Sequence, residues 1–417
     1  MSWEIDTLGN YSKVISGYAF KSDSFRTDNG IPIIKIKNIQ REYVEIDGEY
    51  FVDTSYLSLD PKFHCIKNDI LISLTGSHIT LPNSVVGRVA KYHYDFTSLL
   101  NQRGGKIVVT NPDKLENNYL YYYLCQNEIR IKLAQFGRGG ANQCNISPSN
   151  VESIPIILPP LETQKRIASI LSNYDDLIEN NLKRIKLLEE TAQNIYKEWF
   201  VNFRFPNYEH TEFEEESGLP VGWEKVIFSD LYSLNNGCAF KSEDYKNEGT
   251  PILRTRDYST SFFIQMNDPI YLSTDLINNH SKYLVEELDF LIIMVGASIG
   301  KYGVVLKKDL PSLLNQNQWA IRTLSEFSVY NLFKIFSLQD VMRELLMKRT
   351  GAARDFFRAS FLKELKVIKP NLSNILEFND KVEPIMNMIS LLLSQNQKLK
   401  EARDILLPRL MNRTIEV

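Results

Sequence analysis

The chain has 417 residues, of which 43% are hydrophobic and 24% charged, a composition typical of a globular protein with room for two or three domains. The net charge of −3 excludes a strongly basic protein, yet residues 208–220 alone hold five glutamates, without which −3 becomes +2. Charge therefore permits DNA binding without demanding it. No apolar run approaches the ~20 residues that a bilayer span needs. We expect no membrane association and a cytoplasmic location.

The cysteines also favour a cytoplasmic location. Cys65, Cys125, Cys144 and Cys238 form no CxxC pair, which favours reduced thiols and argues against a structural zinc site. The histidines are dispersed along the chain, and with the cysteines and methionines they form no metal-binding set. We expect no metal site.

The first predicted unit, residues 1–158, is mostly β. Short β-branched or alternating runs bounded by Gly, Asn and Asp predict strands within residues 31–39, 42–52, 69–76, 85–92 and 104–110. A single helix is predicted at about 116–135. The unit is therefore expected to be an α+β domain.

A long helix is predicted over residues 159–205, near the middle of the chain. Pro159 and Pro160 suit a helix start and Pro206 lies just past its end. Apolar residues at steps of three and four form one continuous seam, which comprises Ile167, Ile170, Leu171, Tyr174, Leu177, Ile178, Leu182, Ile185, Leu188, Ala192, Ile195 and Trp199. A rod of about 57 Å with such a seam needs a partner helix.

After the acidic linker, residues 206–220, a second unit is predicted at 221–369, with strands within 251–258, 289–296, 302–308 and 318–323 and a helix at 329–347. Residues 370–417 hold a second long helix at about 375–410, with Gln395 as a polar residue in its seam. Pro384 and Pro408 predict a kink or a late start.

The two units are an internal repeat. Residues 3–79 align with 223–299 at a constant offset of 220. Trp3 matches Trp223, and the hexapeptide Gly17–Ser22 matches Gly237–Ser242. The offset then drifts to 214 at the shared Leu-Leu-Asn-Gln, residues 99–102 and 313–316, and to 211 in the long helices. We predict a pseudo-two-fold arrangement in which the two long helices pack on each other antiparallel.

Catalytic and nucleotide-binding motifs are missing from the sequence. Gly296, Gly300 and Lys301 follow an apolar run, but the spacing is one residue short of a P-loop and Tyr302 replaces the hydroxyl residue. A strand–turn–strand is the better interpretation. The sequence contains no Asn/Asp-Pro-Pro-Tyr, GxSxG or HExxH, and no nuclease carboxylate set can be placed.

Polar loops at matching places in both copies suit DNA instead, because Arg, Asn and Gln can read base edges while Lys, Arg and Gly-rich backbone bind phosphates. Any one of these residues can equally be a solvated or structural side chain, and the Asn-Gln shared by both copies can belong to the scaffold. The candidate DNA-binding residues are Lys21, Lys35, Lys37, Asn38, His78, Arg103, Arg138, Asn142, Gln143, Lys241, Arg254, Arg256, Lys301, Asn317, Gln318, Arg349, Arg354 and Arg358.

Four motifs together make the chain resemble a type I restriction–modification specificity subunit. They are Gly-x-x-Phe-Lys-Ser in both copies, Asp-Ile-Leu-Ile…Gly at 69–76 with its echo at 289–296, the stretch 145–171 that contains Pro-Pro-Leu-Glu-x-Gln, and Gly-Leu-Pro-Val-Gly-Trp at 218–223 with Arg-Asp-Ile-Leu-Leu-Pro-Arg-Leu at 403–410. The second copy departs from the pattern at 371–376, which leaves open how the C-terminal helix begins.

This resemblance implies two target-recognition domains, each of which reads one half of a bipartite DNA site. The helices would form an antiparallel coiled-coil spacer that docks two methyltransferase subunits, with restriction/translocase subunits as further partners. The chain itself would be non-catalytic and bind no cofactor, while S-adenosylmethionine, ATP and Mg²⁺ belong to the partners. Expected packing residues are Ile178, Leu188, Ile195, Trp199, Ile389, Leu399 and Leu406.

Two other functions compete with this one. The chain could be the recognition part of a methyltransferase or nuclease, for which it lacks the catalytic motifs. It could also be a helical scaffold that binds partner subunits but no DNA.

Overall fold

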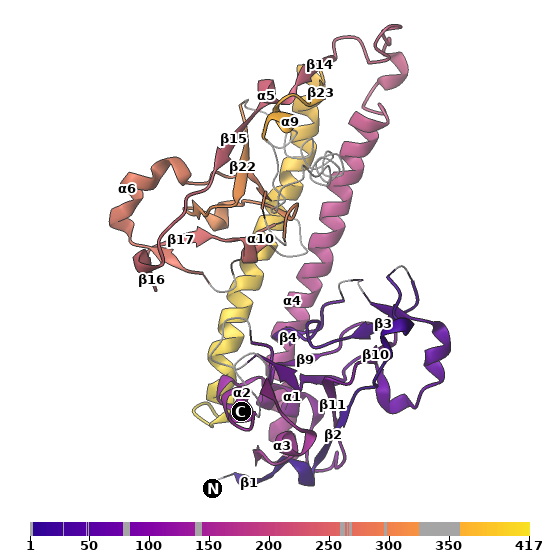
Figure 1. Cartoon of the computed structure of the whole chain (residues 1–417), viewed down its shortest axis with the longest axis vertical. Helices are drawn as coiled ribbons and strands as arrows, with labels where there is room; N and C mark the ends of the chain where they lie inside the picture. Colours follow the sequence, from indigo (N-terminus) through magenta and orange to yellow (C-terminus); the bar gives the residue numbers. More distant parts are fainter. Residues whose placement is uncertain are drawn as a thin grey trace. The chain divides into compact units, whose positions relative to one another are not determined.

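The computed structural model describes residues 3–27, 29–46, 48, 50–77, 84–137, 144–258, 263–264, 266, 269–295, 298–324 and 359–417. The chain forms two compact units, one of residues 1–178 with 398–417 and one of residues 179–397. Helices α4 (Leu161–Tyr196) and α10 (Leu372–Met411) contribute to both units (Figure 1). The predicted domain boundaries, which separate these helices from the globular parts, stay a prediction. Within the described ranges no helix is long and apolar enough to cross a membrane.

Unit 1 is built on a five-stranded sheet of order β2-β11-β7-β9-β4 and a four-stranded sheet of order β5-β3-β10-β6, with the two-stranded pairs β1·β13 and β12·β8. Its strands are β1 (Glu4–Thr7), β2 (Ser12–Ser16), β3 (Ile31–Ile34), β4 (Glu42–Tyr43), β5 (Phe51–Val52), β6 (His64–Cys65), β7 (Ile70–Ser73), β8 (Thr75–Gly76), β9 (Val89–Lys91), β10 (Ser98–Leu100), β11 (Gly104–Val109), β12 (Cys144–Asn145) and β13 (Pro155–Leu158). Its short helices are α1 (Asn117–Cys125), α2 (Asn127–Gln135) and α3 (Pro148–Glu152).

The prediction of one helix over 116–135 is wrong, because Gln126 interrupts it. Gln126 has an extended backbone with ψ of 134°, and its side-chain amide donates to the Tyr123 carbonyl at the end of α1. The chain therefore makes a corner between α1 and α2. Buried residues of α1, including Tyr119 and Leu120, share one core with α4 residues such as Ile167 and Leu171.

The start of α4 explains a motif that the sequence analysis singled out. Gln164, of the Pro-Pro-Leu-Glu-x-Gln stretch, is fully buried. Its Oε1 accepts from the Glu116 backbone at 2.9 Å, and its Nε2 donates to the carbonyls of Lys114 and Pro159. Gln164 thus fixes the first turn of α4 to the segment that leads into α1.

An ion pair with a buried arginine joins the two long helices within unit 1. Arg403 of α10 donates to Asp175 of α4 at 2.6 Å, and the Tyr122 hydroxyl of α1 donates to the other oxygen of the same carboxylate at 2.6 Å. The Arg403 side chain is only 7% exposed. Burying Arg403 costs desolvation, which its pairs with Asp175 and with Asp404 of its own helix offset. The network therefore connects α1, α4 and α10.

Unit 2 repeats the plan with four-stranded sheets of order β15-β22-β19-β20 and β16-β18-β17-β21 and the pair β14·β23. Its strands are β14 (Glu224–Ile227), β15 (Tyr232–Asn236), β16 (Tyr245–Lys246), β17 (Thr250–Leu253), β18 (Tyr271–Leu272), β19 (Phe290–Ile293), β20 (Tyr302–Val304), β21 (Leu313–Leu314), β22 (Gln318–Thr323) and β23 (Lys366–Lys369). Its short helices are α5 (Phe228–Leu231), α6 (Ile277–His280) and α9 (Ala359–Lys363). The predicted helix at 329–347 lies outside the described residues.

Equivalent pairings in the two units confirm the internal repeat and the α+β class. The pair β1·β13 corresponds to β14·β23, and the parallel pair β3·β10 corresponds to β17·β21. The shared glycine has one physical reason in both copies. An added Cβ at Gly17 would overlap the carbonyl oxygen of Asn101, and one at Gly237 would overlap that of Asn315. The Gly-x-x-Phe-Lys-Ser and Leu-Leu-Asn-Gln motifs are therefore two sides of one close backbone approach.

Helix α10 begins at Leu372, so of the kink or late start predicted from Pro384 the late start is wrong, while the kink stays a prediction. Asn371 caps the helix, since its Oδ1 accepts from the Asn374 backbone at 3.0 Å. The Trp223 indole, from the Gly-Leu-Pro-Val-Gly-Trp motif, donates to the Asn374 side chain at 3.3 Å. Polar side chains thus anchor both helix starts, with different residues in the two copies.

Helices α4 and α10 also pack on each other within unit 2, where aromatic residues surround the end of α4. Tyr196 and Trp199 each contact Phe378 with ring centroids 6.0 Å apart. Earlier in α4, Asn181 donates to Asn396 of α10 at 2.9 Å. Positions rise along α4 while their partners fall along α10, so the helices run antiparallel here, as predicted.

The polar residue of the seam was assigned wrongly. Gln395 is exposed and Leu182 is 47% exposed, whereas Asn181 and Asn396 are 7% and 5% exposed. At the offset of 211, the positions that correspond to Asn181 and Asn396 in the repeat are Leu392 and Ile185, and both belong to the apolar core. The asparagine layer therefore has no copy in the repeat and sets the helix register.

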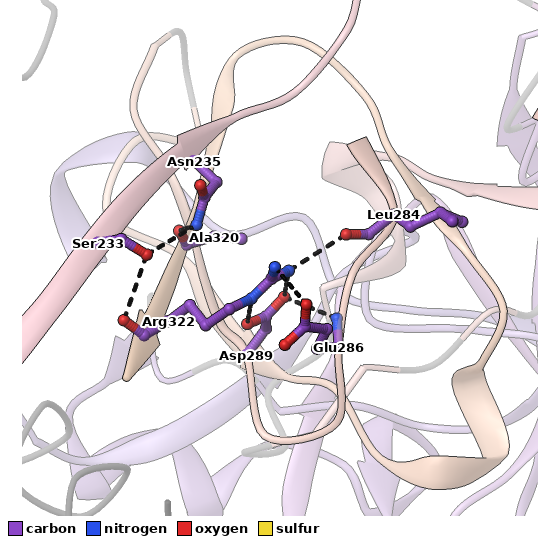
Figure 2. Close-up of polar contacts among 7 residues, drawn as sticks. All are labelled: Ser233, Asn235, Leu284, Glu286, Asp289, Ala320 and Arg322. Carbon is purple, nitrogen blue, oxygen red and sulfur yellow. Dashed lines mark hydrogen bonds and ion pairs between the residues drawn. The ribbon is translucent and has the colours of Figure 1, made fainter. Parts of the chain in front are cut away.

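A second ion pair fixes the strand that carries the Asp-Phe-Leu-Ile motif. Arg322 of β22 donates through Nε and one terminal nitrogen to the two oxygens of Asp289, at 2.8 and 2.7 Å, and through the other to Glu286 at 2.6 Å (Figure 2). The hydrogen bond from Arg322 to Asp289 contributes most to raising the pKa of Arg322. Asp289 is 1% exposed, so this bidentate pair closes the turn before β19.

Replacing Arg322 with Met tests the ion pair. The change leaves the Asp289 carboxylate buried without its cation, so we expect a loss of about 3–5 kcal/mol in the stability of unit 2, measured by hydrogen exchange across β19 and β22. Lys369→Met is the control, because its pair with Glu224 is exposed and is worth at most about 1 kcal/mol. Equal effects of the two substitutions would contradict the assignment.

Glu189 of α4 makes stability depend on pH. Burial, then the neighbouring Glu190, raises its pKa to about 7. The folded pKa lies above the unfolded one, so the cost of ionising Glu189 is absent below pH ~4.5 and complete above pH ~7. Glu189→Gln should raise stability at pH 8 by about 1–3 kcal/mol and change it little at pH 4.5, as thermal unfolding at both pH values would show.

Glu162→Gln is the matched control on the same helix. Its hydrogen bond with Lys165 lowers the pKa of Glu162, so this substitution should give no stabilisation at pH 8. A pH-independent effect of Glu189→Gln would refute the assignment.

Candidate nucleic-acid interface

The same turn follows β3 in unit 1 and β17 in unit 2. The Lys35 backbone donates to the Asn38 side chain at 2.9 Å, and the Arg254 backbone donates to the Asp257 side chain at 2.7 Å. In both turns the fourth residue donates back to the first carbonyl at 2.9 Å. The candidate cations Lys35 and Lys37 thus occupy the positions of Arg254 and Arg256.

Two candidate base readers lie inside this scaffold. Asn38 is 3% exposed, and its Nδ2 also donates to the Glu45 carbonyl. Gln318 is fully buried, with its Oε1 accepting from Tyr258 and its Nε2 donating to Leu253 and Asn315. These bonds give both amides a role in shaping the loops. Asn317 is exposed in the left-handed region with φ of 69°.

The unit 1 turn packs on aromatic rings. Lys35 Nζ lies 3.1 Å from the Tyr50 ring centroid and 4.1 Å from that of Phe25. Lys37 Nζ lies 4.8 Å from the Tyr50 centroid. These cation–π contacts orient both ammonium groups at the turn.

The remaining candidates divide into exposed residues and residues outside the description. Lys21, Arg103, Lys241, Arg256 and Lys301 are exposed, and Arg254 is partly buried. Lys241 pairs with Glu243 at 3.4 Å. The candidates that lie outside the described residues are His78, Arg138, Asn142, Gln143, Arg349, Arg354 and Arg358.

Lys301 has a counterpart that sequence alignment missed. Gly300 has φ of +84° and donates to the Ile293 carbonyl, while Gly87 has φ of +69° and donates to the Ser73 carbonyl. Each glycine is followed by a cation, Lys301 or Arg88, just before an equivalent strand, since β19·β20 corresponds to β7·β9. The antiparallel pairing of β19 with β20 confirms the strand–turn–strand interpretation. The segment from Ser73 to Gly87 is longer than that from Ile293 to Gly300, which hid the match.

Gln40 connects the turn after β3 with Arg88. Its Nε2 donates to the Lys37 carbonyl at 2.7 Å and its Oε1 accepts from Arg88 at 3.3 Å. Arg88, Gln40 and the nearby Arg41 were absent from the predicted site residues. For Arg88 the sequence did hold a signal, since Gly87-Arg88 matches Gly300-Lys301.

The packing residues predicted for the helices fall into the two units. In unit 2, Trp199 and Ile389 are buried while Leu188 and Ile195 are partly buried against the same core. In unit 1, Ile178 is 8% exposed, Leu399 is partly buried and Leu406 packs against the core. Which of these contact a partner subunit stays a prediction.

Among the described residues, no group of three or more His, Cys, Asp and Glu side chains could hold a metal ion. The loops hold lysine and arginine beside scaffold amides, and such cations can bind anions. This geometry defines the class of protein: a duplicated α+β protein with basic loops and two paired long helices.

Comparison with known proteins identifies the family. The model of the type I restriction modification DNA specificity domain matches residues 1–190 and 220–401, so the chain belongs to this family. It is 24% identical to the type I restriction enzyme MjaVIII specificity subunit of Methanocaldococcus jannaschii, covering 100% of this chain and 93% of that one. It is 23% identical to the EcoKI specificity subunit of Escherichia coli K12, with 92% and 82% covered.

A solved structure shares the fold. The S subunit of a type I restriction–modification system from M. genitalium superposes with a TM-score of 0.53 at 17% identity, covering 98% of this chain and 96% of that one. The family places the chain as a DNA specificity subunit of a type I restriction–modification system. Subunits of this family bind no cofactor themselves, and catalysis lies in the partner subunits.

Gln318→Leu separates a scaffold role from base reading. The change leaves the Tyr258 hydroxyl and the Asn315 carbonyl without this partner, while the Leu253 carbonyl keeps the Asn315 backbone amide. We therefore expect a loss of about 2–4 kcal/mol in unit 2, measured by hydrogen exchange. Asn317→Gly is the neighbouring control, because glycine keeps φ of 69° at little cost. Unchanged stability with an altered DNA target would show that Gln318 reads bases.

Proposed function

We propose that each β-rich domain reads one half of a bipartite, asymmetric site in duplex DNA, while α4 and α10 set the gap between the half-sites. The observation that carries the proposal is the duplicated turn, whose backbone geometry is the same while its side chains differ. Lys35 and Lys37 in one copy stand where Arg254 and Arg256 stand in the other. A common scaffold with different polar side chains suits two readers of different sequences.

The helices are the proposed docking site for two methyltransferase subunits, and restriction/translocase subunits complete the complex. S-adenosylmethionine, ATP and Mg²⁺ would bind to those partners. The sequence similarity to specificity subunits over the whole chain supports membership of such a complex. The antiparallel pairing, with a buried asparagine layer in unit 2, supports a ruler with one register.

A scaffold that binds partners but no DNA is the main rival. It would not require the cations of the two turns, which are held over aromatic rings in unit 1 and beside Asp257 in unit 2. Phosphate contacts by such cations should make DNA binding depend steeply on salt, whereas scaffold activity would not.

A domain exchange tests the proposal. Residues 1–158 are replaced by the equivalent domain of a divergent specificity subunit, and the chimaera is assembled with the methyltransferase subunits. Mapping of methylated motifs should then show one half of the site changed, with the other half and the gap retained. An exchange of 221–369 should change the opposite half.

The reciprocal exchange serves as the control for folding and assembly. Changes in both half-sites from one exchange would refute modular reading. Wild-type complexes that enrich no motif from a randomised duplex pool would refute DNA recognition itself.

A further inference from the structure

Three arginines of unit 1 line one pocket. It lies where residues just before β4 and β9 meet the corner between α1 and α2, elements that Figure 1 places side by side. Arg41, Arg88 and Arg130 line it together with Gly87, Cys125 and Asn127. Arg41 is exposed, while Arg88 and Arg130 are partly buried. The pocket is therefore open to solvent on the side of Arg41.

The two inner arginines are held in place by neutral oxygens. Arg88 donates to the Gln40 side chain at 3.3 Å, and Arg130 donates to the carbonyls of Ser84 and Val86 at 2.7 and 3.3 Å. Among the described residues, neither arginine forms an ion pair with a carboxylate. Their positions are fixed, but their charge is not neutralised from within the described chain.

The cost of this arrangement is electrostatic. Burial lowers the pKa of both Arg88 and Arg130, and the positive charge of Arg41 lowers both further. Guanidinium groups nevertheless stay protonated in proteins, so the pocket keeps its positive charge. Like charges held close together in a partly buried site are destabilising unless an anion joins them. A pocket of this kind is preorganised for an anionic ligand.

The repeat indicates that the position is used in both copies. Gly87 and Gly300 adopt the same left-handed turn, and the next residue is a cation in each, Arg88 or Lys301. The flanking strands correspond, as described above. A cation at the same place in two domains whose loops differ in length indicates that the position of Arg88 is common to both copies.

We propose that Arg41, Arg88 and Arg130 form a clamp for neighbouring backbone phosphates of duplex DNA. The clamp rests on the proposed function and adds a contact that positions the DNA without reading its sequence. Arginine matches phosphate through two parallel hydrogen bonds. A DNA strand offers a charge every ~3.4 Å of helix axis, so neighbouring phosphates can offset the charges of Arg88 and Arg130 together. A single carboxylate from a partner protein would leave one of these two charges.

The clamp adjoins the basic turn after β3. Gln40 bonds the Lys37 carbonyl and the Arg88 guanidinium at once, which makes Lys35, Lys37, Arg41 and Arg88 one connected cationic set. A duplex phosphate backbone can follow such a set from residue to residue. The turn would then be held against the DNA by contacts on either side of Gln40.

The test is a salt titration of DNA binding by the complete complex with its methyltransferase subunits. Arg41→Ala with Arg88→Ala removes two cations, while Arg130 is kept because it holds the Ser84 and Val86 carbonyls. We expect affinity to fall about 10- to 100-fold for target and non-target duplexes alike. The slope of log affinity against log salt should become shallower by about 1.8, that is about 0.9 for each lost phosphate contact.

Arg204→Ala with Arg413→Ala is the control, since it removes the same charge from exposed arginines paired with Glu198 and Glu416. It should leave the slope within about 0.5 of the wild type. A binding readout that needs no affinity comes from Cys125, whose thiol lines the pocket. Saturating duplex should slow the reaction of Cys125 with N-ethylmaleimide in the wild type. In the single variant Arg88→Gln the same duplex should slow this reaction less.

The outcomes separate the possibilities. An unchanged slope and affinity in the Arg41/Arg88 variant, with wild-type binding intact, would overturn the clamp while the proposed function stands. An altered methylated motif would overturn it in favour of base reading, and lost assembly with normal DNA affinity would overturn it in favour of a protein carboxylate. A wild-type complex that binds no DNA would instead refute the proposed function.

Discussion

The pairing of α4 with α10 is the constraint on which the rest of the structure depends. Each helix belongs to both compact units, so neither unit has a complete core without residues from both. In unit 1 the Arg403–Asp175 pair joins them, and in unit 2 the Asn181–Asn396 bond does so. Both contacts are polar and specific in geometry, and both are largely shielded from solvent. A shift of one helix by a turn would break both bonds, and each buried polar group left unsatisfied costs about 1–3 kcal/mol.

This constraint also breaks the symmetry of the duplication. An exact repeat could pair its helices in two equivalent ways, because each helix would carry the same seam. The asparagine layer has Ile185 and Leu392 as its symmetry mates, and Arg403 and Asp175 correspond to Ala192 and Met386, which are buried in the core of unit 2. The two halves of the pair therefore differ in chemistry where they agree in shape. Polar complementarity, rather than apolar burial, favours one of the two ways of pairing the helices over the other.

The two recognition domains separate scaffold from variable surface in the same manner. The glycine at 17 and 237, the turn-closing Asn38 or Asp257 and the aspartate before the central strand are common to both copies. The cation that holds this aspartate comes from different positions, Lys106 in one unit and Arg322 in the other. Shared backbone geometry with substituted side chains is what a duplicated reader of two sequences requires. It also explains why the overall charge of −3 carries little information about binding, since the basic residues gather at loops and glutamates fill the linker.

Sequence periodicity alone determined the class of fold, the duplication and the existence of two long helices, because apolar spacing and repeated motifs are local properties that survive without coordinates. It failed where a single residue decides the path of the chain. Gln126 breaks a helix by an extended backbone, and Asn371 begins one ahead of Pro384. Only the tertiary structure distinguished Asn396 from Gln395 in the seam. Neighbouring residues of a helix point about 100° apart, and the contact with the partner helix decides which of the two is buried. The tertiary structure likewise moved Gln318 and Asn38 into the scaffold and brought Arg41, Arg88 and Arg130 together. These residues are far apart in sequence, and their meeting depends on strand pairing and on loops of unequal length, which no spacing rule encodes.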